Sequence, residues 1–211
     1  MNLITSQIQD YCIAHSTRPS ELARELETHT RTSIHGSNML IGEMESSVIT
    51  FLIKLGQVKN ILELGTYTGY SALVMAEQLP EDGKLITIDI NPHTTELAKS
   101  FWKRSPHGNK IQSILKSGPE ALSTIEQTFD LIFIDADKNN YPHYLTWSLQ
   151  HLSPRGIIIV DNTLWSGKIL TPGLDKQTDS IICHNEMAKS LEGYVKTLLP
   201  VRDGMFLITK A

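Results

Sequence analysis

The chain is poor in the residues that build disulfide frameworks and zinc clusters. Its 211 residues include only two cysteines, Cys12 and Cys183, which lie far apart and outside any CxxC pair. This spacing argues against a zinc site or a redox-active dithiol. Two unpaired thiols are typical of a reducing compartment, so we expect a cytoplasmic protein.

Long apolar runs and long basic runs are also missing. The longest apolar stretches, such as IIIV at residues 157–160, are far too short to cross a bilayer. The first residues, MNLITSQIQDYC, lack the basic flank and apolar core of a secretory signal. The formal net charge of −4 argues against a nucleic-acid partner, although a local basic groove would still permit one. We expect no membrane partner.

What the chain does contain is an alternation of strand and helix patterns. The patterns predict helices at residues 70–79, 92–104, 119–125 and 141–152, between strands at residues 60–64, 84–90, 110–116, 130–135 and 156–161. Helical crossovers between these strands predict an α/β fold with a doubly wound, mostly parallel sheet. Two further strands, at residues 194–199 and 205–210, predict an antiparallel C-terminal hairpin on the sheet edge, which makes seven strands.

The two ends of this pattern differ from its centre. Residues 1–35 are polar but helical in pattern, and another helix is predicted at residues 43–55. We expect residues 1–35 to form a helical cap within a single domain that spans residues 1–211. Near the other end, the sequence SGKILTPGLDKQTD at residues 166–179 predicts a polar loop that acts as a lid or faces a substrate.

Open parallel sheets bind ligands beyond the carboxyl ends of their strands, so these ends hold the candidate site. The first strand continues into ELGTYTG at residues 63–69, a glycine-containing turn into a helix. Tyr67 stands where a dinucleotide-binding GxGxxG motif has its middle glycine, which disfavours a pyrophosphate ligand. Asp89 ends the second strand, where a carboxylate can accept from both hydroxyls of a ribose. Asp89 could instead cap the next helix, a role that Asn91 fills at least as well.

Polar side chains also end the fourth and fifth strands. Asp135 follows one strand in LIFIDADKNNY at residues 131–141, and Asp161 and Asn162 follow the next in IIIVDN at residues 157–162. If the strands are neighbours, the three side chains share one edge and offer the hard oxygen ligands that Mg²⁺ prefers. No histidine or cysteine is needed, which disfavours zinc. The alternative is that each carboxylate separately caps a strand end.

Taken in order, these motifs resemble those of a known enzyme family. The motifs are LELGTYTGYSAL (62–73), LPEDGKLITIDI (79–90), FDLIFIDADKNNYPHY (129–144), GIIIVDNTLWSG (156–167) and DGMFLITK (203–210). From about residue 36 onward, the chain resembles the cation-dependent S-adenosylmethionine O-methyltransferases. The resemblance is to the caffeoyl-CoA and catechol O-methyltransferase families, and most of all to their small bacterial relatives. It implies a Rossmann-like methyltransferase fold and a homodimer, to which the N-terminal helices contribute.

The resemblance also implies roles for individual residues. It implies that Asp89 binds the ribose of the cofactor and that Gly118 lies near the adenine. Asp137 and Tyr144 would lie beside the cofactor. The residues implied for its methionine part are Glu63, Gly65, Thr66 and Ser71, with Ile41 alongside. Asp135, Asp161 and Asn162 match the ligands of a divalent cation, Mg²⁺ first and Mn²⁺ or Ca²⁺ as alternatives. Lys138 matches the general base, with Asp135 beside it in the catalytic group. One departure is Met39-Leu40-Ile41-Gly42-Glu43, where the family usually has a proline.

The acceptor expected from this reading is a small aromatic with two vicinal hydroxyls, of catechol or caffeoyl type. Trp165, Tyr141 and Tyr144 could wall in its ring, although such residues are as often packing residues. Three alternatives stay open. The acceptor could be a hydroxylated tRNA base, which a basic patch of Lys99, Lys103, Arg104 and Lys110 would favour if it faced the site. An NAD-dependent dehydrogenase and a non-enzymatic nucleoside-binding module are the others, and the module would leave Lys138 and Asp161 without a role.

Overall fold

The computed structural model describes residues 5–211, so residues 1–4, where the predicted cap begins, lie outside the described residues. The helices are α1 (Ser6–Ala14), α2 (Glu21–Ser33), α3 (Glu43–Gly56), α4 (Tyr70–Gln78), α5 (Pro92–Trp102), α6 (Gly118–Leu122), α7 (Tyr141–Gln150) and α8 (Lys176–Ser190). The strands are β1 (Asn60–Leu64), β2 (Lys84–Asp89), β3 (Ile111–Leu115), β4 (Phe129–Ile134), β5 (Leu152–Val160), β6 (Tyr194–Leu199) and β7 (Met205–Lys210).

The strands form one seven-stranded sheet in the order β3-β2-β1-β4-β5-β7-β6. Strands β1 to β5 run parallel, and β7 lies antiparallel between β5 and β6. The strand order reverses between β1 and β4, which is where ligands of such sheets bind. This confirms the predicted doubly wound, mostly parallel sheet with an antiparallel C-terminal hairpin, and it shows that β7 joins the hairpin to the sheet.

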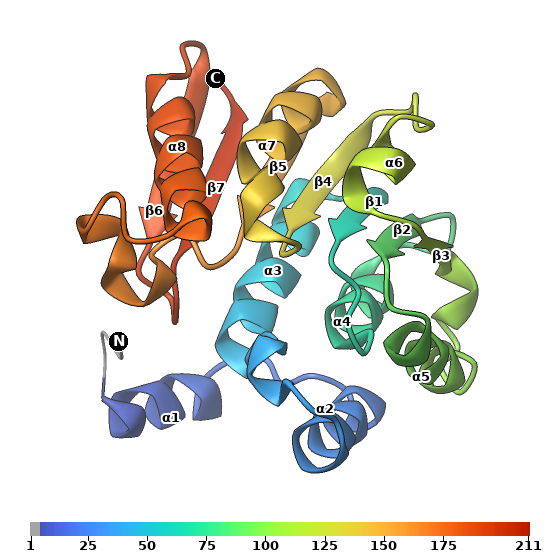
Figure 1. The fold of residues 1–211 in the computed structure, drawn as a ribbon. Coiled ribbons are helices and arrows are strands. Elements are labelled where there is room, and N and C mark those ends of the chain that lie inside the picture. Colours follow the sequence, from blue (N-terminus) through green and yellow to red (C-terminus); the bar gives the residue numbers. More distant parts are fainter. Residues whose placement is uncertain (1–4) are drawn as a thin grey trace.

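Helices cover both faces of the sheet (Figure 1). One core lies between the sheet and α2 to α5, and the other lies between the sheet and α6 to α8. In β4, Leu131 and Phe133 join the first core, whereas Ile132 and Ile134 join the second. A strand segment buried on both faces needs apolar residues at every position, which explains the apolar runs Leu131–Ile134 in β4 and Ile157–Val160 in β5.

Backbone hydrogen bonds continue past the ends of the central strands and align the residues that follow them. The Gly65 N–H donates to the Ile88 carbonyl (3.0 Å), the Asp135 N–H to the Leu64 carbonyl (2.8 Å), and the Asp161 N–H to the Ile134 carbonyl (3.0 Å). Gly65, Asp135 and Asp161 therefore lie side by side at one edge of the sheet, as the parallel arrangement predicts.

The segment after β5 differs from the predicted loop. A 3-10 segment spans Trp165–Leu170, and α8 begins at Lys176, with Asp175 capping it by accepting from the Thr178 N–H (2.8 Å). The buried face of α8 consists of Thr178, Ile181, His184 and Ala188. Only one of these four is strongly apolar, so the helix has no clear apolar periodicity for sequence analysis to detect.

The N-terminal helices contact the rest of the structure unequally. Helix α1 buries none of its residues, whereas α2 buries Ala23, Leu26 and Thr30 and packs against α4. That residues 1–35 form a cap within one domain stays a prediction. Over residues 5–211, no helix combines the length and the apolar character that crossing a bilayer requires.

Candidate active site

A pocket of about 1140 Å³ opens at the carboxyl ends of β1, β2 and β4. Most of the predicted site residues line it: Ile41, Gly65, Thr66, Ser71, Asp89, Gly118, Asp135, Asp137, Lys138 and Asn162. Glu63, Tyr144 and Asp161 are not on its wall; each is almost fully buried behind it. The volume exceeds that of a typical drug-sized site, so a nucleoside-sized molecule and a small aromatic can share it.

Gly65 allows β1 and β4 to end in contact. Its φ is +102°, and a Cβ at this position would lie 2.2 Å from the Asp135 carbonyl oxygen. Only glycine fits such a close approach in a left-handed conformation. The turn then passes through Tyr67, whose φ of +47° is also left-handed and whose N–H points to the next strand end.

Asp89 joins this turn to the loop that follows β2. Its Oδ2 accepts from the Tyr67 N–H (2.8 Å) and its Oδ1 accepts from the Asn91 N–H (2.8 Å). The helix cap of α5 is Asn91, whose Oδ1 accepts from the His93 N–H (3.0 Å). Asp89 therefore does not cap α5 and faces the pocket, where its remaining lone pairs can accept from a ribose.

Glu63 lies behind the wall of the pocket and is fully buried. Its Oε2 accepts from the Thr87 hydroxyl (2.5 Å), while its Oε1 is buried with no hydrogen-bond partner among residues 5–211. Burial is the main reason that the pKa of this carboxyl rises to about 8, and repulsion from Asp135 and Asp89 raises it further. Hydrogen bonds from the hydroxyls of Ser71 and Thr87 lower the pKa but do not offset the effect of burial. Glu63 is thus an acceptor that lacks a partner next to the pocket.

The acidic edge consists of two carboxylates and one amide. Asp161 is 1% exposed, and its Oδ1 accepts from the Asn162 N–H (2.8 Å). Burial raises the pKa of Asp161 well above its ordinary value, and the charges of Asp135 and Glu45 raise it further. Asn162 adopts a left-handed backbone conformation, φ +58°, which asparagine tolerates better than most residues.

This donor set fits a hard divalent cation in its chemistry, because oxygen ligands and an excess of negative charge are what such an ion requires. Within the described residues, however, no group of three or more histidine, cysteine, aspartate or glutamate side chains is arranged to hold a metal. A cation here would depend on the amide of Asn162 and on non-protein ligands. The role of Asp135, Asp161 and Asn162 as metal ligands stays a prediction.

Lys138 is buried at the rim and makes two short contacts. Its Nζ donates to Asp135 Oδ1 (2.9 Å) and to the Tyr141 hydroxyl (2.6 Å), which in turn donates to the Asp161 carbonyl (3.1 Å). Burial lowers the pKa of Lys138, but Asp135 and Tyr141 outweigh it and the net direction is upward. A general base needs the opposite direction, so these contacts hold Lys138 as a cation.

Of the three aromatic residues considered for an acceptor wall, only Trp165 lines the pocket. Tyr141 and Tyr144 are fully buried. The Tyr144 hydroxyl donates to Asp137 Oδ1, and its ring packs against Gly118, where a Cβ would lie 2.3 Å from the hydroxyl oxygen. Tyr144 therefore positions Asp137 from behind the pocket wall. Gly118 has no side chain, which leaves room for the Tyr144 ring.

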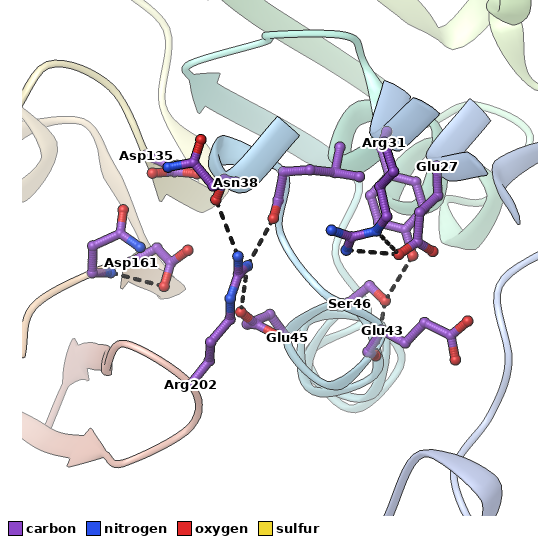
Figure 2. Close-up of polar contacts among 12 residues, drawn as sticks. Glu27, Arg31, Asn38, Glu43, Glu45, Ser46, Asp135, Asp161 and Arg202 are labelled. Carbon is purple, nitrogen blue, oxygen red and sulfur yellow. Dashed lines mark hydrogen bonds and ion pairs between the residues drawn. The ribbon is translucent and has the colours of Figure 1, made fainter. Parts of the chain in front are cut away.

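Sequence analysis missed Arg202, which also lines the pocket. Its guanidinium donates to the carbonyls of Leu40 (2.7 Å) and Asn38 (3.1 Å) and to Glu45 Oε1 (3.0 Å), as Figure 2 shows. These partners lie more than 150 residues away along the chain. No local pattern could reveal the contact, because an arginine in a hairpin turn is ordinarily solvent-exposed.

Comparison with known proteins agrees with this geometry. The profile of the O-methyltransferase family matches residues 13–211. The chain is 34% identical to caffeoyl-CoA O-methyltransferase 1 of Arabidopsis thaliana over 81% of this chain and 68% of the relative. It is 32% identical to catechol O-methyltransferase domain-containing protein 1 of Mus musculus over 95% of this chain and 78% of the relative.

A solved structure gives the same result. The S-adenosylhomocysteine-bound methyltransferase PaMTH1 of Podospora anserina superimposes with a TM-score of 0.89 and 26% identity, covering 97% of this chain and 94% of that one. The dehydrogenase and the non-enzymatic module are thereby set aside, and the family and the enzyme class inferred from the motifs are confirmed. The chain belongs to the S-adenosylmethionine-dependent O-methyltransferase family, with caffeoyl-CoA and catechol O-methyltransferases among its relatives.

Proposed function

We propose that this enzyme methylates one hydroxyl of a small aromatic acceptor that carries two vicinal hydroxyls, with a divalent cation at Asp135, Asp161 and Asn162. The observation that carries the proposal is the pairing of two carboxylates at the ends of the neighbouring strands β4 and β5: Asp135 lines the pocket that contains most of the predicted cofactor residues, and Asp161 lies buried directly behind its wall. The names of the relatives, caffeoyl-CoA and catechol O-methyltransferases, support an acceptor of this class.

In the proposed arrangement, the cofactor supplies the methyl group and the cation lowers the pKa of a hydroxyl bound to it. The protein's own residues hold and orient these groups. In the strand order, Gly118, Asp89 and Gly65 follow β3, β2 and β1, where we propose that the cofactor binds, whereas Asn162 and Trp165 follow β5, beyond Asp135 at the end of β4. Orientation of this kind contributes several kcal/mol to catalysis when the reacting atoms are held in line.

For Lys138 we propose the role of proton acceptor in the loaded site, where a divalent cation that takes up Asp135 would weaken the contact that keeps Lys138 charged in the free enzyme. Two substitutions test it. Lys138→Arg keeps a permanent charge next to Asp135 but cannot accept a proton, whereas Lys138→Met removes both properties. If Lys138 is the base, both variants lose most of kcat. If Lys138→Arg retains wild-type kcat, the role is electrostatic and the base lies elsewhere.

The main experiment measures methyl transfer from labelled S-adenosylmethionine to caffeic acid. Turnover should require Mg²⁺, disappear with chelator and in Asp161→Asn, and persist in Asp82→Asn, a control whose carboxylate pairs with Lys59 on the exposed surface. 4-Hydroxycinnamic acid, which lacks the second hydroxyl, should be a poor acceptor. Turnover that survives chelation would refute the metal. Equal turnover of both acids would refute the vicinal diol.

A hydroxylated tRNA base is less well supported as the acceptor. None of Lys99, Lys103, Arg104 and Lys110 lines the pocket. Lys99 pairs with Glu96, and Arg104 pairs with Glu25. A basic surface leading to the site would have to come from other residues.

We also propose a homodimer formed through the N-terminal helices, in line with the resemblance. Phe51 and Leu55 lie one turn apart on α3 and are each 67% exposed, and Ile8 and Tyr11 are exposed on α1. Large apolar residues on adjacent helices favour association. Light scattering on the wild type and on Phe51→Glu tests this: the variant should shift to monomer. The cytoplasmic location expected from the sequence stays a prediction.

A further inference from the structure

Arg202 connects segments that are distant in the sequence. It occupies a left-handed position, φ +49°, in the turn between β6 and β7. From there its guanidinium reaches the segment Asn38–Ile41, which we call the entrance segment, and the first turn of α3 (Figure 2). A planar guanidinium is the one side chain that can satisfy three acceptors in such a fixed fork.

The same turn also holds the opposite rim of the pocket, residues Asn162–Ser166, which we call the rim loop. The Leu164 N–H donates to the Asp203 carbonyl (2.8 Å), the Thr163 N–H to the Gly204 carbonyl (3.1 Å), and the Ser166 N–H to Asp203 Oδ1. Residues 201–204 therefore lie between the two rims, with Arg202 bound to one and its neighbours bound to the other.

Glu45 fixes the direction of Arg202. Its side chain is 1% exposed, whereas that of Arg202 is 31% exposed. The second oxygen of Glu45, Oε2, is buried without a partner, and a Cβ at position 42 would lie 2.8 Å from it. Gly42 thus leaves room for the carboxylate at the start of α3, where the helix dipole favours a negative charge. This also gives a structural reason for the unusual Gly42, which directly follows the entrance segment and precedes α3.

We propose that Arg202, held by Glu45, is a positioning residue for methyl transfer: it fixes the distance between the entrance segment and the rim loop. The proposal rests on the proposed function, because it places the cofactor against Ile41 and the acceptor beside Trp165. The two reacting groups then approach from two segments that the 201–204 turn connects directly. Loosening that connection lowers the fraction of bound molecules that are aligned for transfer.

Kinetics separate positioning from stability. Arg202→Met alone leaves Glu45 buried without a partner and should destabilise the fold, because an unpaired buried charge is costly. The double variant Arg202→Met/Glu45→Gln removes both charges, so its Tm should recover toward that of the wild type. Its kcat should nevertheless stay about tenfold or more below wild type, since small misplacements have effects of that size.

Two further variants set the controls. Arg104→Met removes an arginine whose bidentate pair with Glu25 is exposed and far from the pocket, and it should leave kcat unchanged. Arg202→Lys keeps the charge without the fork and should recover only part of kcat. Recovery of kcat together with Tm in the double variant would refute the proposal. Full recovery in Arg202→Lys would refute it equally, because charge alone would then suffice.

Hydrogen exchange tests the connection without any acceptor or metal. S-adenosylhomocysteine should slow exchange of the Leu164 and Ser166 amides in the wild type. In the double variant it should still slow exchange of the Tyr67 amide, beside Asp89, but not of the rim-loop amides. Equal protection of the rim loop in both proteins, or none in the wild type, would contradict the proposal. This readout stands even if the acceptor class or the cation proves wrong.

Discussion

Replacing Glu63 by glutamine should stabilise the free enzyme while weakening its cofactor binding. The folded state raises the pKa of Glu63 from its ordinary value of 4.5 to about 8, chiefly because the carboxyl is buried. Between these two values the folded state retains a proton that the unfolded state releases. The wild type therefore loses free energy of unfolding as pH rises from 4.5 toward 8, and loses no more from this group above that range.

The magnitude follows from one proton. The loss is about 1.4 kcal/mol per pH unit within this range, and it sums to a ceiling of about 5 kcal/mol. Glutamine keeps the shape of the neutral acid and does not titrate, so its stability advantage should grow with pH at this rate. For a chain of this length, each kcal/mol corresponds to about 2–4 °C in Tm.

The assay is thermal unfolding of both proteins without cofactor, from pH 5.5 to pH 8. The difference in Tm between Glu63→Gln and the wild type should increase steadily with pH. Subtracting the two curves removes the contributions of all other titrating groups. Curves that run parallel over this interval would refute the reasoning, because they would show that Glu63 does not carry the raised pKa.

Cofactor binding provides an independent measure of the same property. If the ammonium of S-adenosylhomocysteine pairs with Glu63, it favours the ionised carboxylate and expels the proton. With a pKa of about 8, roughly nine in ten molecules carry that proton at pH 7. Calorimetry in buffers of different ionisation enthalpy should therefore show release of almost one proton for the wild type. Glu63→Gln should release none and bind more weakly, by about 1.5–3 kcal/mol for the lost charged hydrogen bond.

Two further predictions concern the fold. Gly65→Ala should destabilise the fold by about 3 kcal/mol or more, because the added Cβ would collide with the Asp135 carbonyl at φ +102°. The control Gly173→Ala, at φ +79° with no described atom within 4 Å, should cost only about 1 kcal/mol. Chemical denaturation compares the two variants, and equal losses of stability would contradict the close approach. Burial lowers the pKa of His184 to about 4, so the wild type should lose stability as pH falls from 6.5 toward 4, by up to about 3 kcal/mol. His184→Gln should flatten that part of the stability profile, and an unchanged acid slope would contradict the shift.

Local sequence patterns were enough to predict the sheet and the positions of most site residues. The central parallel strands contain buried apolar runs, such as Leu131–Ile134 in β4, and the chain places a glycine directly after β1 and an aspartate directly after β4. Parallel pairing then brings Gly65, Asp89 and Asp135 to one edge without further information. The sheet prediction is confirmed and the candidate residues gather at one rim because one physical requirement, an apolar strand that ends in polar groups at an open edge, determines both. The roles of these residues stay predictions.

The parts that were missed depend on contacts between distant residues. The buried face of α8 includes the polar residues Thr178 and His184. These residues are buried because α8 packs against α7, and their own hydropathy does not indicate it. Arg202 has no local pattern at all, because its partners are Asn38, Leu40 and Glu45. The upward shift in the pKa of Lys138 could not be predicted from the sequence either, because it depends on Tyr141 and Asp135 contacting the same nitrogen atom.

The charges gathered around the pocket argue for cationic ligands. Buried or half-buried acids here outnumber the bases that contact them: the acids are Glu45, Glu63, Asp135 and Asp161, and the bases are Lys138 and Arg202. Burial raises the pKa values of Glu63 and Asp161, and repulsion from Asp135 raises both further, which means that the folded chain lacks positive charge at this edge. If the predicted roles are correct, a sulfonium cofactor would supply positive charge next to Glu63 through its ammonium group, and a divalent cation would supply it next to Asp161. The free site is therefore less stable than the ligand-bound site. Such a loss of stability is expected where residues are retained for binding and not for folding.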